Sequence, residues 1–100
     1  MQRGLKVTKG PKDLGRIFIL NSGKHLCGRL SENSICLSGE KVSKKHCQFS
    51  SDGEQVSVLD LKSSNGLFVN AEKVSEVNLK LGDKIQVGEY VLELVDKEKS

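Results

Sequence analysis

The sequence is poor in aromatic residues and in proline, and it has no long apolar run. Its 100 residues include no tryptophan, one proline, one tyrosine and three phenylalanines. A folded core must therefore be built mainly from valine, leucine and isoleucine. No apolar stretch is long enough to cross a membrane as a helix, and no apolar signal-peptide core follows Met1. We expect an intracellular protein, in the nucleus or the cytoplasm, with no membrane partner.

Cysteine and net charge are also sparse. Cys27, Cys36 and Cys47 are odd in number and irregular in spacing, which is not the pattern of a disulfide framework. We expect free, buried thiols in a reducing compartment instead. The formal net charge of +3 is mild and charges of both signs are interspersed, whereas a nucleic-acid-binding domain usually carries a dense basic stripe. The composition therefore argues against a direct nucleic-acid partner.

The length allows one domain at most. A chain of 100 residues can bury a hydrophobic core without disulfides or metals. We expect residues 1–100 to form a single domain, with its core at about 4–95. Residues 96–100 are expected to be a charged tail or the start of a linker to a longer parent protein.

The apolar residues recur at the period of a β-strand. Val56 and Val58, like Ile85 and Val87, are each separated by one residue, and no window keeps a helical period. Glycines and small polar residues interrupt these runs at short intervals, which favours an all-β sandwich or barrel. The strands are predicted near residues 4–8, 16–20, 24–27, 34–37, 47–51, 55–61, 67–69, 77–79, 84–87 and 90–95. Asp52-Gly53 and Asn65-Gly66 predict tight turns.

Small polar residues and one arginine gather where the chain is expected to turn. They form the segments Gly28-Arg29, Ser43-Lys44-Lys45-His46 and Ser63-Ser64-Asn65-Gly66, followed by Asn70. Binding residues commonly lie on loops that a rigid scaffold positions. One guanidinium with several hydroxyls and amides, and without paired acids, suits the binding of an anion better than acid–base catalysis.

The order and spacing of these segments closely resemble the forkhead-associated (FHA) domain, a phosphothreonine-binding module. The pattern continues through Leu59-Asp60-Leu61 and Leu79-Lys80-Leu81-Gly82-Asp83, so the resemblance covers about residues 5–95. It implies an eleven-stranded β-sandwich of two twisted, mostly antiparallel sheets, with the ligand loops at one end. It also implies a non-catalytic module that needs no cofactor or metal and binds a phosphothreonine-containing protein.

The resemblance assigns ligand roles to five residues. Arg29 and Ser43 correspond to the phosphate ligands, and Lys44 and Ser64 correspond to positions that add phosphate contacts. Asn65 corresponds to the residue that holds the peptide backbone beside the phosphothreonine. Its side-chain amide can both donate and accept hydrogen bonds, which suits an extended peptide.

Other residues are expected to support the loops or to set specificity. Gly28, His46, Gly66 and Asn70 are assigned to loop support. A basic residue at the position of Lys41 tends, in the family, to favour an acidic residue three places after the phosphothreonine. We therefore expect this chain to show a mild preference of that kind.

Three other interpretations were weighed. A structural scaffold or dimerisation domain could use a sheet face instead of the loops, although the domain is expected to be monomeric. A hydrolase triad of Ser43, His46 and Asp60 lacks a nucleophile elbow. A zinc site lacks paired ligand spacing, and its candidates are His25, Cys27, Cys36, His46 and Cys47.

The resemblance alone does not select a pathway. Members of the family occur in DNA-damage signalling, transcription, cell-cycle control and bacterial secretion. The sequence shows no feature that chooses among these settings.

Overall fold

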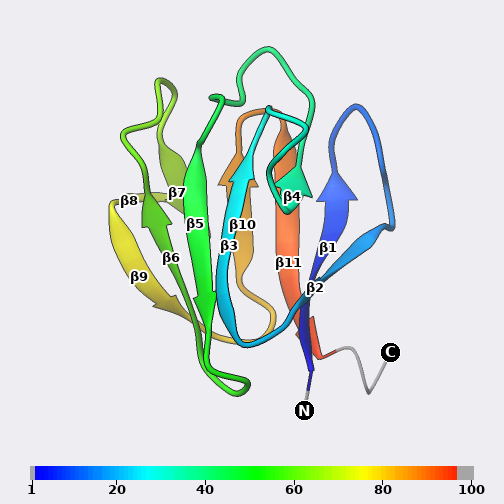
Figure 1. Ribbon diagram of the computed structural model, residues 1–100. Coiled ribbons are helices and arrows are strands. Elements are labelled where there is room, and N and C mark those ends of the chain that lie inside the picture. The colour runs from blue at the N-terminus through cyan, green and yellow to red at the C-terminus, as the bar shows by residue number, and fades with distance from the viewer. Residues whose placement is uncertain (1, 97–100) are drawn as a thin grey trace.

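The computed structural model describes residues 2–96 and shows a sandwich of two β-sheets, with no helix in this range (Figure 1). The six-stranded sheet has the order β2-β1-β11-β10-β7-β8, and the five-stranded sheet has the order β4-β3-β5-β6-β9. The first sheet contains β1 (Arg3–Lys9), β2 (Ile17–Leu20), β7 (Leu67–Val69), β8 (Glu72–Val74), β10 (Lys84–Val87) and β11 (Tyr90–Asp96). The second contains β3 (Gly23–Gly28), β4 (Ile35–Cys36), β5 (Cys47–Ser51), β6 (Val56–Asp60) and β9 (Glu76–Leu79).

All strand pairs are antiparallel except β3 with β4, which is parallel. The all-β, eleven-stranded sandwich expected from the resemblance is therefore confirmed. Each of the ten strands predicted from periodicity overlaps an observed one, and β8 is the strand that periodicity missed. Within residues 2–96 no helix is long or apolar enough to span a membrane.

The core lies between the two sheets and follows the alternation seen in the sequence. In β11, Tyr90, Leu92 and Leu94 are buried, while the residues between them are half-buried on the outer face. Phe49 of β5 and Ile85 of β10 are completely buried from opposite sheets. Because side chains alternate across a strand, one apolar residue in two suffices to fill the space between the layers.

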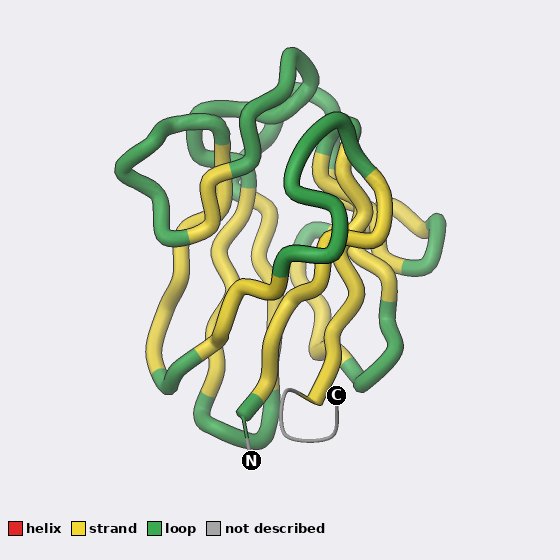
Figure 2. The backbone as a smooth tube through the Cα atoms, turned by 90° about the vertical axis from the view of Figure 1, so that its right-hand side faces the viewer, coloured by secondary structure: helices red, strands yellow, loops and turns green. Residues whose placement is uncertain are grey.

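The termini of the described chain lie close together at the end opposite most long loops (Figures 1 and 2). Arg3 pairs with Asp96 across β1 and β11, with 3.6 Å between nitrogen and carboxylate oxygen. Asp96, which the sequence groups with a charged tail, is thus the last residue of β11. The rest of that expected tail lies outside the described residues.

The turn predicted at Asp52-Gly53 connects β5 and β6. Gly53 has a φ of +101°, and the amide of Asp52 donates to the carbonyl of Gln55 at 3.1 Å. The Asp52 carboxylate accepts the amides of Gln55 and Glu54, at 2.7 and 3.0 Å. These two hydrogen bonds lower the pKa of the Asp52 carboxyl. This is the usual role of aspartate in a turn.

The hairpin between β7 and β8 turns on Asn70 and Ala71, which have φ values of +50° and +72°. Positive φ at both central residues is what a two-residue type I′ turn requires. Asparagine tolerates this conformation, whereas alanine loses about 1–2 kcal/mol in it. We expect Ala71→Gly to raise the free energy of unfolding, by up to about 1 kcal/mol after the larger entropy of a glycine in the unfolded chain is subtracted.

Urea denaturation of the wild type and of Ala71→Gly would measure this effect. A serine at the same position is the comparison, because it keeps the Cβ and with it the strain. A lower urea midpoint for Ala71→Gly than for the wild type would contradict the strain at this turn.

Candidate functional site

Three loops at one end of the sandwich carry the residues that the sequence selects as ligands (Figure 1). They are the β3–β4 loop (29–34), the β4–β5 loop (37–46) and the β6–β7 loop (61–66). Arg29 begins the first loop, Ser43 lies in the second, and Ser64 and Asn65 lie in the third. All three loops extend from strands of the five-stranded sheet, so one rigid layer positions most of the site.

Arg29 is exposed but held in place. Its main-chain amide donates to the carbonyl of Ser43 at 3.0 Å, and its Nε donates to the carbonyl of Val42 at 3.2 Å. Among residues 2–96, no carboxylate pairs with Arg29 and neither terminal NH₂ group has a hydrogen-bond partner. The loop therefore presents an unneutralised guanidinium whose planar donors suit a phosphate.

Ser43 is bonded to each of the other two loops. Its carbonyl accepts the Arg29 amide, and its Oγ accepts the amide of Ser64 at 3.0 Å. Its own amide donates to Nδ1 of His46 at 3.1 Å. The sequence led us to expect that both the hydroxyl and the amide of Ser43 could reach a ligand. The amide is already used within the loop, so the hydroxyl hydrogen is the group left to donate.

His46 is completely buried beneath these loops. Because Nδ1 accepts the Ser43 amide, the ring proton lies on Nε2, which donates to the carbonyl of Gly66 at 2.8 Å. One side chain thus fixes the β4–β5 loop against the β6–β7 loop. Both ring nitrogens are bonded to the main chain and neither contacts Ser43 Oγ, so the arrangement is not that of a hydrolase triad.

Gly28 lies where two main chains approach closely. A Cβ at this position would overlap the carbonyl of Lys44 and lie 2.8 Å from Nδ2 of Asn33. Glycine is therefore required at this position because a side chain would not fit. The same Asn33 is buried and donates to the Lys44 carbonyl at 2.8 Å. Sequence reasoning missed Asn33, because an asparagine in a loop reads simply as a turn residue.

Comparison with known proteins identifies the family. The family model for the FHA domain matches residues 25–88. The chain belongs to the FHA domain family. It is similar to the oxoglutarate dehydrogenase inhibitor of Corynebacterium jeikeium, with 36% identity over 88 residues that make up 88% of this chain and 60% of the relative. It is also similar to the glycogen accumulation regulator GarA of Mycolicibacterium smegmatis, with 34% identity over 96% of this chain and 60% of the relative.

A solved structure from work on phosphothreonine-dependent FHA domain interactions superimposes with a TM-score of 0.88 at 29% identity, covering 96% of this chain and 97% of the other. This FHA domain spans about three fifths of the length of the two curated relatives. Both relatives are bacterial and are named as an inhibitor and a regulator. The nucleus and the DNA-damage response, which the resemblance alone left open, gain no support from them.

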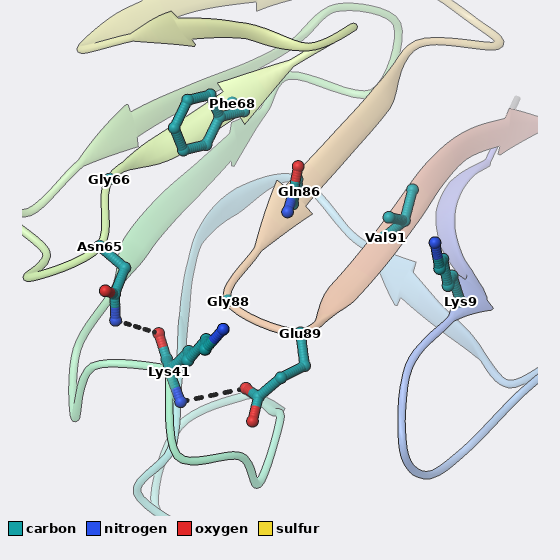
Figure 3. A pocket seen from close by; sticks show the side chains of 9 residues that line it. All are labelled: Lys9, Lys41, Asn65, Gly66, Phe68, Gln86, Gly88, Glu89 and Val91. Atoms are coloured by element: carbon teal, nitrogen blue, oxygen red, sulfur yellow. Dashed lines mark hydrogen bonds between the residues drawn. The ribbon is translucent and has the colours of Figure 1, made fainter.

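Asn65 of this FHA domain is exposed and oriented by the neighbouring loop. Its Nδ2 donates to the carbonyl of Lys41 at 3.0 Å, and no residue in 2–96 donates to its Oδ1 (Figure 3). The left-handed residue of the Asn65-Gly66 turn is Gly66, with a φ of +88°. Asn65 therefore stays in an ordinary backbone conformation, with one face of its amide free for a ligand.

A pocket of about 480 Å³ begins at Asn65 and continues onto the outer face of the six-stranded sheet (Figure 3). Its floor is one row of directly paired residues across β7, β10, β11 and β1, namely Phe68, Gln86, Val91 and Lys9. The loops and the β10–β11 turn supply its other walls, with Lys41, Asn65, Gly66, Gly88 and Glu89. A peptide held at Asn65 would have this pocket beside it.

The remaining predicted residues divide into two groups. Lys41, Lys44 and Ser64 are exposed at the loop end, and the carbonyl of Lys44 accepts the buried Asn33 amide. Asn70 is not part of the ligand loops. It bonds the β9–β10 turn, where its Nδ2 donates to Asp83 at 3.0 Å. Asn70 therefore supports a different turn from the loops that carry the ligand residues.

Two thiols lie beneath the loop end. Cys27 of β3 and Cys47 of β5 are directly paired across the sheet, completely buried and free. A hydrogen bond with Cys27, together with burial, raises the pKa of the Cys47 thiol well above its ordinary value. Such a thiol stays protonated and behaves as a small core residue. Cys36 is half-buried and also free.

Proposed function

We propose that this FHA domain is a non-enzymatic recognition module that binds a phosphothreonine in an extended segment of a partner protein. The observation that carries the proposal is the Arg29 guanidinium, which is fixed through Nε to the Val42 carbonyl and lacks a described counter-charge, in a residue whose main-chain amide bonds the Ser43 carbonyl. A phosphate with nearly two negative charges and three acceptor oxygens matches these donors. The similarity to phosphothreonine-dependent FHA domains supports the same ligand.

The phosphate would exchange its hydration for charge-assisted hydrogen bonds. Arg29 supplies the planar donors, Ser43 supplies its hydroxyl hydrogen, and Lys44 and Ser64 add contacts from the rim. Asn65 would bind the main chain of the peptide next to the phosphothreonine, using the amide oxygen that faces away from Lys41. Without the phosphate, Arg29 gains no counter-charge, so an unphosphorylated peptide is expected to bind far more weakly.

The test is binding of the purified protein to an oriented phosphothreonine peptide library, with the unphosphorylated library beside it. Selective capture of phosphorylated peptides would support the proposal and give the preferred motif. If folded protein shows no selectivity for phosphate, the proposal fails. The search would then turn to a sheet face that acts as a phosphate-independent scaffold or dimer contact.

The setting that the relatives support is a regulatory one. Both curated relatives are named for control of an enzyme or a metabolic store, and buried free thiols suit a reducing compartment. We propose an intracellular module whose partner is a phosphorylated protein. We also propose that residues 1–100 act as one FHA domain.

Lys41 is expected to give a mild preference for an acidic residue three places after the phosphothreonine. Its side chain is exposed at the pocket beside Asn65, and an exposed lysine–carboxylate pair contributes about 0–1 kcal/mol. Replacing aspartate by alanine at that peptide position should therefore weaken binding by up to about fivefold.

Isothermal titration with the two peptides would measure the ratio, and the same pair of peptides with Lys41→Met would provide the control. The ratio should fall to about one in Lys41→Met. Equal affinity of the two peptides for the wild type would show that Lys41 does not select an acid.

A further inference from the structure

The short turn between β10 and β11 (88–89) contacts the β4–β5 loop through the Glu89 carboxylate. Its Oε2 accepts the amide of Glu40 at 3.0 Å, and its Oε1 accepts the amide of Lys41 at 3.1 Å (Figure 3). The residues lie 48 and 49 positions apart in the chain. This side chain therefore joins the six-stranded sheet to a ligand-bearing loop of the other sheet.

The residues on either side of Glu89 make the contact rigid. Gly88 has a φ of +58°, and a Cβ there would lie 2.8 Å from the carbonyl carbon and oxygen of Lys41. Tyr90 is completely buried, and its hydroxyl donates to the carbonyl of Ser38 at 2.7 Å. Three consecutive residues, the two of the turn and the first of β11, thus contact one loop, so the Glu89 carboxylate has a defined position.

Lys41 is consequently held on both sides of its main chain. Its amide donates to Glu89, and its carbonyl accepts Nδ2 of Asn65 (Figure 3). The Asn65 side chain is exposed, and the Lys41 carbonyl is the hydrogen-bond partner that the described residues give it. The direction in which the Asn65 amide oxygen faces therefore depends on where Glu89 places the main chain of Lys41.

We propose that Glu89 is a positioning residue for peptide recognition, which acts through the main chain of Lys41 on the side-chain amide of Asn65. This proposal rests on the proposed phosphothreonine-peptide function. The chain of contacts runs from the Glu89 carboxylate in the β10–β11 turn, through the main chain of Lys41 in the β4–β5 loop, to the Asn65 side-chain amide in the β6–β7 loop. Its effect is to orient the group that contacts the peptide main chain.

The phosphate contacts should depend much less on Glu89. Ser43 is held by His46 and Ser64, and Arg29 is held by the carbonyls of Val42 and Ser43. None of these hydrogen bonds involves Glu89. Loss of Glu89 should therefore weaken the binding of the residues that flank the phosphothreonine. The preference for phosphorylated over unphosphorylated peptide should remain. A purely structural role would weaken every ligand together with the fold.

The experiment uses two probes, a phosphothreonine peptide selected from the oriented library and the blocked amino acid N-acetyl-phosphothreonine-N-methylamide. Both are titrated by NMR and calorimetry into the wild type, Glu89→Gln, Asn65→Ala and the double variant. Glu54→Gln is the matched control, because it removes the same charge in the β5–β6 turn at the opposite end. Thermal unfolding is recorded for each protein.

Glu89→Gln is expected to weaken the peptide about fivefold, because a charged acceptor of two amides is replaced by a single carbonyl. The blocked amino acid should change by less than about twofold. In the Asn65→Ala background, Glu89→Gln should weaken the peptide little further, because the Asn65 amide through which Glu89 acts is already absent. Glu54→Gln should bind both probes like the wild type.

Equal weakening of both probes by Glu89→Gln, or an undiminished effect in the Asn65→Ala background, would overturn the proposal. Wild-type affinity of Glu89→Gln for the peptide would overturn it as well, while leaving the phosphopeptide function standing. If the wild type itself binds neither probe, the proposed function fails and the role of Glu89 fails with it.

Discussion

Replacing Arg29 by alanine is expected to abolish capture of a phosphothreonine peptide, with at least about a hundredfold rise in Kd. A hydrogen bond to a charged group contributes about 1.5–3 kcal/mol, and no residue in 2–96 occupies the two terminal NH₂ groups of Arg29 that would make such bonds. Two lost bonds then amount to about 3 kcal/mol or more, and each 1.4 kcal/mol is about tenfold in affinity.

The fold should survive this change. Arg29 is exposed, and the amide that bonds Ser43 is retained by alanine. The side-chain contact that disappears is the one from Nε to Val42. Arg29→Lys should fall between the two proteins, because it keeps the charge but loses the planar fork that pairs with two phosphate oxygens.

Calorimetric titration of one phosphorylated peptide measures the effect. Arg16→Ala is the matched control, since it removes an exposed arginine that lies over the Phe18 ring, 4.4 Å from its centroid, in the β1–β2 region. It should bind like the wild type. Retention of phosphate-selective binding by Arg29→Ala would show that the anion is held elsewhere.

Replacing His46 by alanine is expected to lower the free energy of unfolding by about 3 kcal/mol. The change leaves a cavity at a completely buried position and removes the partners of the Ser43 amide and the Gly66 carbonyl. A buried polar group that loses its partner costs about 1–3 kcal/mol, and the lost packing adds to this. Peptide affinity should fall as well, because Ser43 loses its anchor.

Urea denaturation monitors stability, and peptide titration of the remaining folded protein monitors the site. His25→Ala is the control, because the half-buried His25 side chain has, among the described residues, the carbonyl of Asn21 as its hydrogen-bond partner. This change should cost far less. If His46→Ala does not fold, His46→Gln restores one of the two hydrogen bonds and should recover part of both properties. A stable His46→Ala with unchanged affinity would refute the anchoring role.

The strands were predictable because a core between two sheets requires an apolar residue at every second position of a strand. Every buried position of β11 alternates with a half-buried one, and that period can be read without coordinates. Strand β8 shows no apolar alternation, because Glu72 and Lys73 are exposed and Val74 is half-buried. Its turn also contains alanine in a left-handed conformation, which turn chemistry does not anticipate.

The site was predictable where the resemblance covers it and unpredictable where distant elements meet. The resemblance assigned ligand roles to Arg29, Ser43 and Asn65, and the structure places these residues on adjoining loops joined by hydrogen bonds. Asn33 and Glu89 were missed. Asn33 bonds a carbonyl 11 residues away on the next loop of the same sheet, and Glu89 bonds two amides of the β4–β5 loop, which belongs to the other sheet. Only the folded arrangement of the loops and layers brings such pairs together.

The bonds that join the three loops use main-chain atoms on at least one side. The Arg29 amide meets the Ser43 carbonyl, the Ser64 amide meets Ser43 Oγ, and His46 Nε2 meets the Gly66 carbonyl. The long side chains at the rim, Lys41 and Lys44, take no part in these bonds. Lys41, which the proposed function assigns to partner choice and not to the phosphate, should therefore be exchangeable, by evolution or by protein engineers, to redirect the domain without rebuilding the hydrogen bonds that hold Arg29 and Ser43.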